Sequence, residues 1–360
     1  MRALLIGGTG PTGPSVVEGL LARGYDVSIF HRGTHEVSLP KDVEHIHGDP
    51  HFLETLNQAL GIRTFDLAVV MYGRLRFIAE AMCGRVPRMV SVGGTGVYRG
   101  WMNLDPSAPV FIPTPEDAPL QDDPDVDKFT YRMVEAESVI MRAHQASHYN
   151  ATHFRYPGVY GPRQLAPREW SIIRRILDRR KRLILPDSGL AIRSHGFAKN
   201  MAHAVLLAID KPDESAGQIY NIRDEELFTV RDWIRTIGAV MNHEFEFVEM
   251  PYTLARPARV YSGRSRHQIL DITKVQRELG YHDIVPAAKG IEYTVNWYLE
   301  HKPDPGGEVE QQLRDPFDYE AENLLIDNFL ESVTRIKELA PPRLGFRHPY
   351  AHPKSPDKLE

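Results

Sequence analysis

A glycine-rich turn stands close to the start of the chain. Its glycines recur every three residues between a short apolar run, residues 3–6, and a helical pattern over residues 15–23. Glycines at this spacing let the backbone turn sharply and approach a pyrophosphate, while the helix N-terminus offers unpaired N–H groups to the anion. The pattern predicts a bound dinucleotide. The residues expected to hold it in this turn are Gly7, Thr9, Gly10, Pro11, Thr12 and Gly13.

The end of the second apolar run indicates which dinucleotide is preferred. His31 and Arg32 stand where an acidic residue would accept hydrogen bonds from the adenosine ribose. An arginine cannot accept those bonds, but it can pair bidentately with a 2′-phosphate. We therefore expect NADP, with NAD as the alternative. Asp49 follows the strand that carries His45 and His47. Its carboxylate either receives the adenine amino group or belongs to a plain turn.

The elements that position these residues alternate between short apolar runs and longer helical patterns. Continuous apolar runs of this kind are typical of parallel strands covered by helices on both faces. The expected strands are residues 3–6, 26–30, 66–71, 89–92 and 151–155, and the expected helices are residues 15–23, 51–60, 75–83 and 129–147. The fold class is thus α/β, with a Rossmann-like doubly wound parallel sheet over residues 1–165.

The pattern changes beyond residue 165. Residues 166–300 are expected to form mostly a smaller mixed α/β substrate domain, with segments near 194–222 returning to the sheet. Its expected elements are helices at 168–182, 197–210, 229–241 and 286–300, strands at 219–222 and 244–248, and a short helix from Asp271 to Gly280. The arginines of the 168–182 helix are read as a solvated face, with nucleic-acid binding as the alternative. Residues 301–360 form a C-terminal extension whose amphipathic part, 317–338, packs on the same chain or on a partner.

Several segments resemble the short-chain dehydrogenase/reductase superfamily, in its extended branch of NAD(P)-dependent epimerases and dehydratases. The resemblance covers about residues 1–300. It is carried by Gly7, Gly10 and Gly13, by Gly48-Asp49, and by the segments 90–98, 155–163, 217–222, 271–274 and 279–281. It implies a Rossmann domain, a substrate domain and a helix-paired homodimer. Further cofactor contacts are expected from Tyr72, Gly73, Tyr156, Pro157 and Gly158.

Members of that family use a tyrosine and a lysine four residues later, with a Ser or Thr after the fifth strand. A nearby cation lowers the pKa of the tyrosine, which otherwise titrates near 10. Here Tyr131 is followed at that spacing by Glu135, and a glycine stands where the family usually has its hydroxyl, leaving Thr95 and Ser91 as substitutes. These four residues are the expected catalytic group, in an atypical active site.

Three interpretations of the missing lysine stay open. Lys128, Arg132 or Arg155 could replace it. Alternatively, Tyr131 and Glu135 could act as acid and base in an isomerisation, elimination or epimerisation. In the third interpretation redox catalysis has been lost, and the protein binds the dinucleotide as a sensor or scaffold. Glu135 would be an exposed helical carboxylate if it has no role.

Arginines follow several of the predicted strands. Ligands of doubly wound folds lie beyond the carboxyl ends of the strands, so these side chains are expected to meet an anionic substrate. They are Arg74, Arg76, Arg99, Arg163 and Arg168, and Arg132 joins them from the predicted helix that carries Tyr131. The residues assigned to substrate binding are Arg74, Tyr98, Arg99, Arg163 and His195.

The sixteen histidines suggest no metal site by spacing. His45 and His47 alternate along a strand and so share one face, but no third ligand stands at a recognisable spacing. His144 and His148 form an i, i+4 pair without a carboxylate motif. The sequence is therefore expected to hold no metal.

Composition excludes other classes of protein. The net charge of −5 argues against broad attraction to nucleic acid or membranes. The single cysteine, Cys83, rules out an internal disulfide and fits a reducing compartment. No apolar run is long enough for a signal peptide or a spanning helix. We expect a cytoplasmic homodimer without nucleic-acid or membrane partners.

The leading hypothesis is an NAD(P)-dependent epimerase/dehydratase-like or reductase-like enzyme that acts on an anionic small molecule, such as a sugar derivative. The alternative is a non-catalytic NADP(H)-binding regulator or sensor on the same fold.

Overall fold

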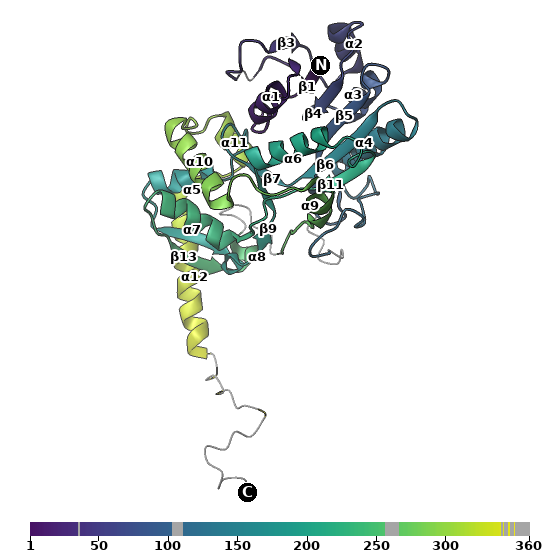
Figure 1. Ribbon diagram of the computed structural model, residues 1–360. Helices are drawn as coiled ribbons and strands as arrows, with labels where there is room; N and C mark the ends of the chain where they lie inside the picture. Colours follow the sequence, from purple (N-terminus) through teal and green to yellow (C-terminus); the bar gives the residue numbers. More distant parts are fainter. Residues whose placement is uncertain are drawn as a thin grey trace, which may run out of the picture. The chain divides into compact units, whose positions relative to one another are not determined.

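The computed structural model describes residues 1–34, 37–102, 111–255 and 266–339, with residues 341, 345 and 349. It divides into two units, Met1–Phe317 and Asp318–Glu360. The first unit holds the glycine turn and nearly all of the described chain (Figure 1). The boundary expected within it, between residues 165 and 166, stays a prediction.

A seven-stranded sheet is the centre of the first unit, and all of its strands are parallel. Its order is β11-β6-β5-β4-β1-β2-β3. The strands are β1 (Arg2–Ile6), β2 (Asp26–His31), β3 (Glu44–His47), β4 (Leu67–Val70), β5 (Arg88–Gly94), β6 (Asn150–Tyr156) and β11 (Gln218–Asn221). The expected α/β fold with a Rossmann-like parallel sheet is confirmed, and the order reverses at β1, where such folds bind ligands.

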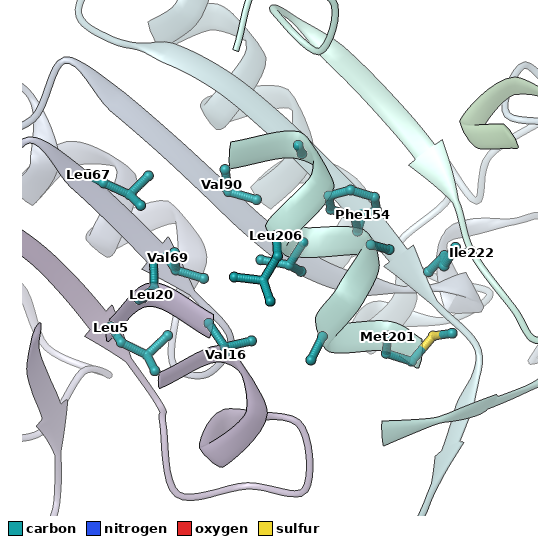
Figure 2. Packing of buried hydrophobic residues seen from close by; sticks show 14 of the residues in the cluster. Leu5, Val16, Leu20, Leu67, Val69, Val90, Phe154, Met201, Leu206 and Ile222 are labelled. Carbon is teal, nitrogen blue, oxygen red and sulfur yellow. The ribbon is translucent and has the colours of Figure 1, made fainter. Parts of the chain in front are cut away.

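Helices cover both faces of the sheet because the strands are apolar on both sides. One face carries α1 (Gly13–Ala22), α6 (Ala198–Asp210) and α9 (Thr273–Leu279). Figure 2 shows its core, in which Leu5 and Val69 of the sheet meet Val16 of α1 and Leu206 of α6. The other face carries α2 (Leu53–Leu60), α3 (Leu75–Met82) and α4 (Lys128–Gln145).

A second core belongs to the same unit and is built from segments that lie before and after β11 in the sequence. Trp170, Trp233 and Tyr298 are buried in it, on three different helices. The helices of this part of the unit are α5 (Trp170–Leu177), α7 (Val230–Val240), α8 (Tyr252–Ala255), α10 (Ala287–Glu300) and α11 (Glu308–Leu313). Its strands pair as β7 (Gly158–Tyr160) with β10 (His195–Phe197), β9 (Ile192–Arg193) with β12 (Phe228–Thr229), and β8 (Arg182–Pro186) with β13 (Glu246–Met250). Single turns of 3-10 helix stand at η1 (Thr95–Val97) and η2 (Asp187–Gly189).

The basic helix expected over 168–182 is shorter in the structure, and only part of its basic run is solvated, since Arg179 and Lys181 are exposed. The helix ends at Leu177, and Arg182 already begins β8. Arg175 is fully buried and donates to both carboxylate oxygens of Asp315, at 2.6 and 3.0 Å. Arg174 pairs with Glu310 at 2.7 Å. Burying a guanidinium requires such a partner, so part of this basic run serves the fold.

The second unit is described through α12 (Tyr319–Leu339), which matches the amphipathic pattern expected over 317–338. The surface that its apolar face meets stays a prediction. The tail expected beyond it lies almost wholly outside the described residues. Throughout the described ranges, no helix has the length and the hydropathy needed to cross a membrane.

Candidate functional site

The glycine turn between β1 and α1 divides its roles among three positions. Gly7 has a φ of +92°, and a Cβ there would lie 2.3 Å from Cβ of Tyr72. A Cβ at Gly13 would lie 2.1 Å from the carbonyl oxygen of Gly8. At Gly10, in contrast, no atom lies within 4 Å of the added Cβ. Gly7 and Gly13 are thus required by packing, whereas Gly10 borders open space.

A cavity of about 290 Å³ adjoins this turn at the carboxyl ends of β1 and β2. Nine of the expected cofactor residues line it: Gly7, Thr9, Gly10, Pro11, Thr12, His31, Arg32, Tyr72 and Tyr156. Seven residues that the sequence pattern did not predict complete the lining: Gly33, Thr34, Met71, Val92, Val159, Gln164 and Leu165. We call this cavity the glycine-loop cavity. Its lining includes Thr12 at the N-terminus of α1 and Tyr156 at the end of β6.

The remaining expected cofactor residues do not line the glycine-loop cavity. Gly13 packs against Gly8. Asp49 lies 2.7 Å from Nδ1 of His51. Burial raises the pKa of Asp49, but the hydrogen bonds with His51 outweigh it and hold that pKa below its usual value. Gly73 lines a second cavity, and Pro157 and Gly158 line neither.

Arg32 stands at the end of β2, as the NADP interpretation requires. Its guanidinium carbon lies 5.5 Å from the ring centroid of Tyr72, which positions the cation at the cavity by a cation–π contact. His31, beside it, is buried. This corner of the glycine-loop cavity can receive a phosphate.

A larger cavity of about 710 Å³ lies next to the first. Both share a wall of Met71, Tyr72, Val92 and Tyr156. The other residues of this second cavity are His51, Gly73, Arg74, Leu75, Arg76, Gly93, Gly94, Val97, Phe129, Arg132, Met133, Ala136, Glu137 and His153. We call it the arginine cavity, because three cations line it.

Those cations are Arg74 and Arg76 at the start of α3, and Arg132 on α4. Within the described ranges, no carboxylate lies within 4.0 Å of their guanidinium nitrogens. Arg74 lies 5.6 Å from the ring centroid of Phe52, and Arg76 lies 4.7 Å from that of Phe77. Three cations without a carboxylate partner favour an anionic ligand.

Helix α4 presents a different face to the arginine cavity from the one expected. Asp127 caps the helix by accepting hydrogen bonds at 3.0 Å from the N–H groups of Phe129 and Thr130, which fixes where the helix begins. The i, i+4 pair that lines the cavity is Phe129 and Met133. Tyr131 and Glu135 line neither cavity, and Glu135 is exposed. Their catalytic role therefore stays a prediction, without a geometric position at this cavity.

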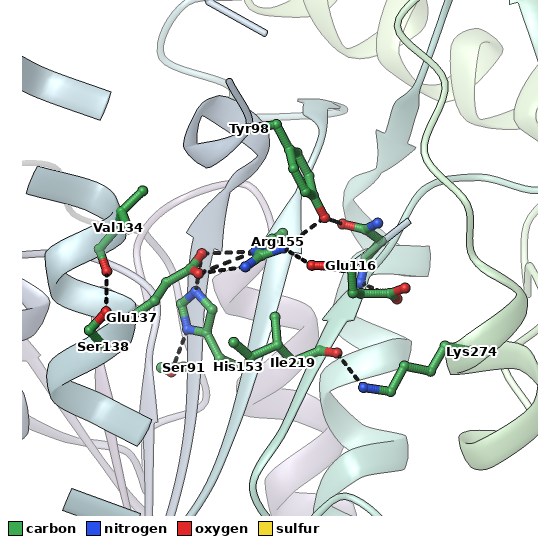
Figure 3. A network of polar contacts seen from close by, with 11 residues as sticks. Ser91, Tyr98, Glu116, Val134, Glu137, Ser138, His153, Arg155, Ile219 and Lys274 are labelled. Carbon is green, nitrogen blue, oxygen red and sulfur yellow. Dashed lines mark hydrogen bonds and ion pairs between the residues drawn. The ribbon is translucent and has the colours of Figure 1, made fainter. Parts of the chain in front are cut away.

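A buried ion pair joins Glu137, which lines the arginine cavity, to Arg155, which does not (Figure 3). Arg155 of β6 donates to both carboxylate oxygens of Glu137, with Nη2 2.8 Å from Oε2. Burial raises the pKa of Glu137, but His153 and Arg155 together bring it down to about 2. Arg155 also donates at 2.8 Å to the hydroxyl of Tyr98 and to the carbonyl of Glu116. The guanidinium of Arg155 is fully used by these contacts, and the residue lines neither cavity. It is therefore not a replacement for the missing lysine.

The expected hydroxyls of Ser91 and Thr95 are both buried. Ser91 Oγ lies 2.8 Å from Nδ1 of His153, and the other ring nitrogen lies 3.4 Å from Glu137. A Cβ at Gly93 would lie 2.7 Å from that ring nitrogen. A glycine at position 93 is thus needed to make room for the imidazole.

The five residues expected to bind the substrate do not lie together in the structure. Only Arg74 lines the arginine cavity. The Tyr98 hydroxyl is buried and donates at 2.6 Å to Asn221. Arg99 pairs with Asp122 at 2.6 Å, and Arg163 is exposed with a φ of +64°. His195 is buried and stacked on Trp233, with ring centroids 4.2 Å apart, because it belongs to the second core.

Sequence reasoning missed Phe129, Met133, Glu137 and His153. One signal was available for the helix: Asp127 is a cap residue, and counting from it places residues 129, 133 and 136 on one stripe. No comparable signal existed for His153, whose position depends on which strand lies beside β5.

Comparison with known proteins bears on this geometry. Residues 73–222 match the model of the NAD dependent epimerase/dehydratase family. The resemblance inferred from the sequence is confirmed over that range, which spans α3 to β11 and most of the arginine cavity.

Solved structures share the fold. UDP-glucose 4-epimerase from Thermotoga maritima, with UDP-glucose, superposes with a TM-score of 0.67 at 18% identity, over 84% of this chain and 100% of that one. UDP-glucuronic acid 4-epimerase from Bacillus cereus, in complex with UDP-glucuronic acid and NAD, gives 0.64 at 17% identity, over 84% and 100%. At such identities these structures establish the architecture alone.

Curated relatives match only in part. An uncharacterised protein of Escherichia coli is 26% identical over 140 residues, which is 33% of this chain and 42% of its own. A UDP-D-apiose/UDP-D-xylose synthase of Oryza sativa is 27% identical over 155 residues, 41% of this chain and 38% of its own. The matched segments span less than half the length of these relatives.

Proposed function

We propose that this protein binds NADP(H) in the glycine-loop cavity and an anionic small molecule, of the sugar-nucleotide class, in the arginine cavity, as an enzyme of the epimerase/dehydratase or reductase type. The observation that carries the proposal is the wall of Met71, Tyr72, Val92 and Tyr156 that the two cavities share. A cofactor and a substrate that exchange a hydride must meet, and a shared wall provides such a place.

The residues present fit a dinucleotide. Gly10 leaves open space beside the N-terminus of α1, where backbone N–H groups can receive a pyrophosphate. Arg32 supplies a cation for a 2′-phosphate. A nicotinamide bound here would supply the hydride chemistry. The chain's own residues would orient both ligands and exclude water from the shared wall. NADP is preferred over NAD on the strength of Arg32, although the Bacillus cereus enzyme of similar fold was solved with NAD.

The arginine cavity supports the anionic ligand. Arg74, Arg76 and Arg132 approach it from two helices, so a diphosphate could be contacted from both sides. The similar folds include proteins solved with UDP-glucose and with UDP-glucuronic acid. We therefore propose a nucleotide sugar as the first ligand to test.

A second candidate function is binding without catalysis, as a dinucleotide-dependent sensor. It is favoured by the α4 face, where Phe129 and Met133 offer neither a hydroxyl nor an amine to the cavity. Ser91 and Thr95 are buried as well, so a catalysed proton transfer would need another group. The imidazole of His51, which is half-buried and lines the same cavity, is the group that could serve in the enzyme alternative.

Calorimetric titration of the full chain tests the proposal. NADPH and NADH are titrated first, and UDP-glucose and UDP-glucuronic acid are then added in the presence of the tighter dinucleotide. Arg74→Ala and Arg132→Ala should each weaken nucleotide-sugar binding about 10- to 100-fold, as the loss of a charge-assisted hydrogen bond implies. Arg99→Ala is the matched control, because Arg99 pairs with Asp122 and does not line the cavity.

Product analysis then separates the two candidates. Because an epimerisation leaves the dinucleotide unchanged overall, the sugar is examined by chromatography as well as the nicotinamide by absorbance. Binding with turnover supports the enzyme, and binding without turnover across the tested sugars supports the sensor. Failure of both dinucleotides to bind would refute both candidates.

A further inference from the structure

Three histidines meet at the sheet edge that Figure 1 labels β3. His45 and His47 alternate along β3, and His31 ends the neighbouring strand β2. The parallel register pairs His31 directly with His47 and Ile29 with His45, so the three imidazoles share one face of the sheet. The register thus supplies the third imidazole that sequence spacing did not offer.

The ring nitrogens are close enough to share one ion. One nitrogen from each histidine lies within 4.8 Å of the other two. Nε2 of His31 lies only 3.0 Å from Nδ1 of His45. A tetrahedral zinc site with Zn–N bonds of 2.0–2.1 Å has nitrogens about 3.4 Å apart, between these two values. His45 and His47 are exposed, so their side chains can rotate by the small amount required.

The hydrogen bonds identify what an ion would replace. The N–H of Gly33 donates to Nδ1 of His31 at 3.2 Å, so in this arrangement the proton of the His31 ring is on Nε2 and is directed at His45. For Nε2 to bind an ion while the ring stays neutral, the His31 proton must move to Nδ1, and the hydrogen bond from the Gly33 N–H is then lost. The ion takes the place of the Nε2–H···Nδ1 hydrogen bond to His45, and no proton is lost from the ring. Neutral imidazoles suit zinc, copper and nickel, whereas magnesium and calcium prefer oxygen ligands.

We propose that His31, His45 and His47 form a binding site for a divalent transition-metal ion, Zn²⁺ being the first to test, with one coordination position left open. The ion would fasten the edge strand β3 to β2, since two ligands come from one strand and the third from the other. This site is separate from the arginine cavity, and it does not depend on the proposed function. His31 also lines the glycine-loop cavity, so the ion would lie at the Arg32 corner of that cavity.

The test uses the full chain without a histidine tag, stripped with a chelator and titrated with ZnCl₂ by calorimetry in the absence of dinucleotide. We expect saturable binding of one ion per chain, no binding of Mg²⁺, and a melting temperature that rises with the zinc concentration, because a ligand of the folded state stabilises it. Co²⁺ gives an independent readout through the absorption bands of a tetrahedral nitrogen site.

The decisive variant is His45→Ala/His47→Ala, which removes two exposed side chains and should leave the fold intact. It should weaken zinc binding by more than the roughly 10- to 100-fold that loss of an outer-sphere partner costs. His148→Ala/His282→Ala removes two other exposed imidazoles and should bind zinc as the unaltered chain does. Equal zinc affinity in the two double variants, or no saturable zinc binding by the unaltered chain, would overturn the proposal.

Discussion

The imidazole of His153 occupies the space that a side chain at Gly93, on the neighbouring strand, would need. Gly93 lies on β5 and His153 on β6, and a Cβ at Gly93 would stand 2.7 Å from Nε2 of the imidazole. The position of the ring is fixed at both nitrogens, because Ser91 Oγ lies 2.8 Å from Nδ1 and Oε1 of Glu137 lies 3.4 Å from Nε2. The absence of a side chain at Gly93 of β5 is therefore tied to the histidine on β6.

Gly93→Ser should lower the free energy of unfolding by about 1–3 kcal/mol, the usual cost of overpacking a buried site. Urea denaturation measures it. Gly94→Ser is the matched control, because a Cβ there meets first the end of the flexible Met133 side chain, at 3.2 Å. Equal losses in the two variants would show that His153 is not the constraint.

Two glycines of the turn should separate folding from binding. Gly13→Ala places a Cβ 2.1 Å from the Gly8 carbonyl oxygen, so it should lower stability and the melting temperature clearly. Gly10→Ala meets no atom within 4 Å and should melt like the unaltered protein, yet bind NADPH more weakly because its methyl group faces the cavity. Full NADPH affinity in a folded Gly10→Ala variant would contradict the proposed position of the pyrophosphate.

Arg32→Asp should reverse the dinucleotide preference. An aspartate repels a 2′-phosphate and can accept from the ribose hydroxyls. The affinity for NADPH should fall about 10- to 100-fold, as expected for the loss of a charge-assisted contact, while that for NADH holds or improves. Fluorescence titration with both dinucleotides measures the ratio, and an unchanged ratio would remove the argument for NADP.

The face of α4 can be tested with charge. Met133→Glu adds a carboxylate beside Arg132 and in the path of an anionic ligand, and it should weaken nucleotide-sugar binding at least about tenfold by like-charge repulsion. Tyr131→Phe and Glu135→Gln, on residues that line neither cavity, should leave binding and any turnover unchanged. Loss of turnover in Tyr131→Phe would instead support the catalytic role expected from the sequence.

Glu169 should make stability depend on pH. Burial raises the pKa of this carboxyl from 4.5 to about 7. A group whose pKa is higher in the folded state stabilises the fold below its unfolded pKa, and that contribution is lost as the pH rises through about 7. Glu169→Gln cannot ionise, so relative to the unaltered chain it should gain up to about 3 kcal/mol between pH 5 and pH 8. Urea denaturation at both pH values measures this gain, with the exposed Glu135→Gln as control. A difference that does not change with pH would show that Glu169 is not a buried acid.

Local sequence patterns were sufficient to predict the parallel sheet, most of its helices and the glycine turn. These follow from local patterns: apolar runs such as residues 3–6, cap residues, and glycines at a fixed spacing between a strand and a helix. Nine of the expected cofactor residues line one cavity for the same reason, since they adjoin the ends of strands whose direction the pattern already fixes.

Three features could be read only from the tertiary structure: the face of α4 at the cavity, the pairing of the arginines and the histidine cluster. Which face of α4 meets the cavity depends on where Asp127 starts the helix, and a shift of two residues separates Tyr131 from Phe129 and Met133. The separation of the arginines into cavity-lining and paired residues depended on carboxylates distant in sequence, such as Asp122 for Arg99. The histidine cluster required the register of β2 with β3. No periodicity within one segment contains that information, because the contacts that create it join different segments.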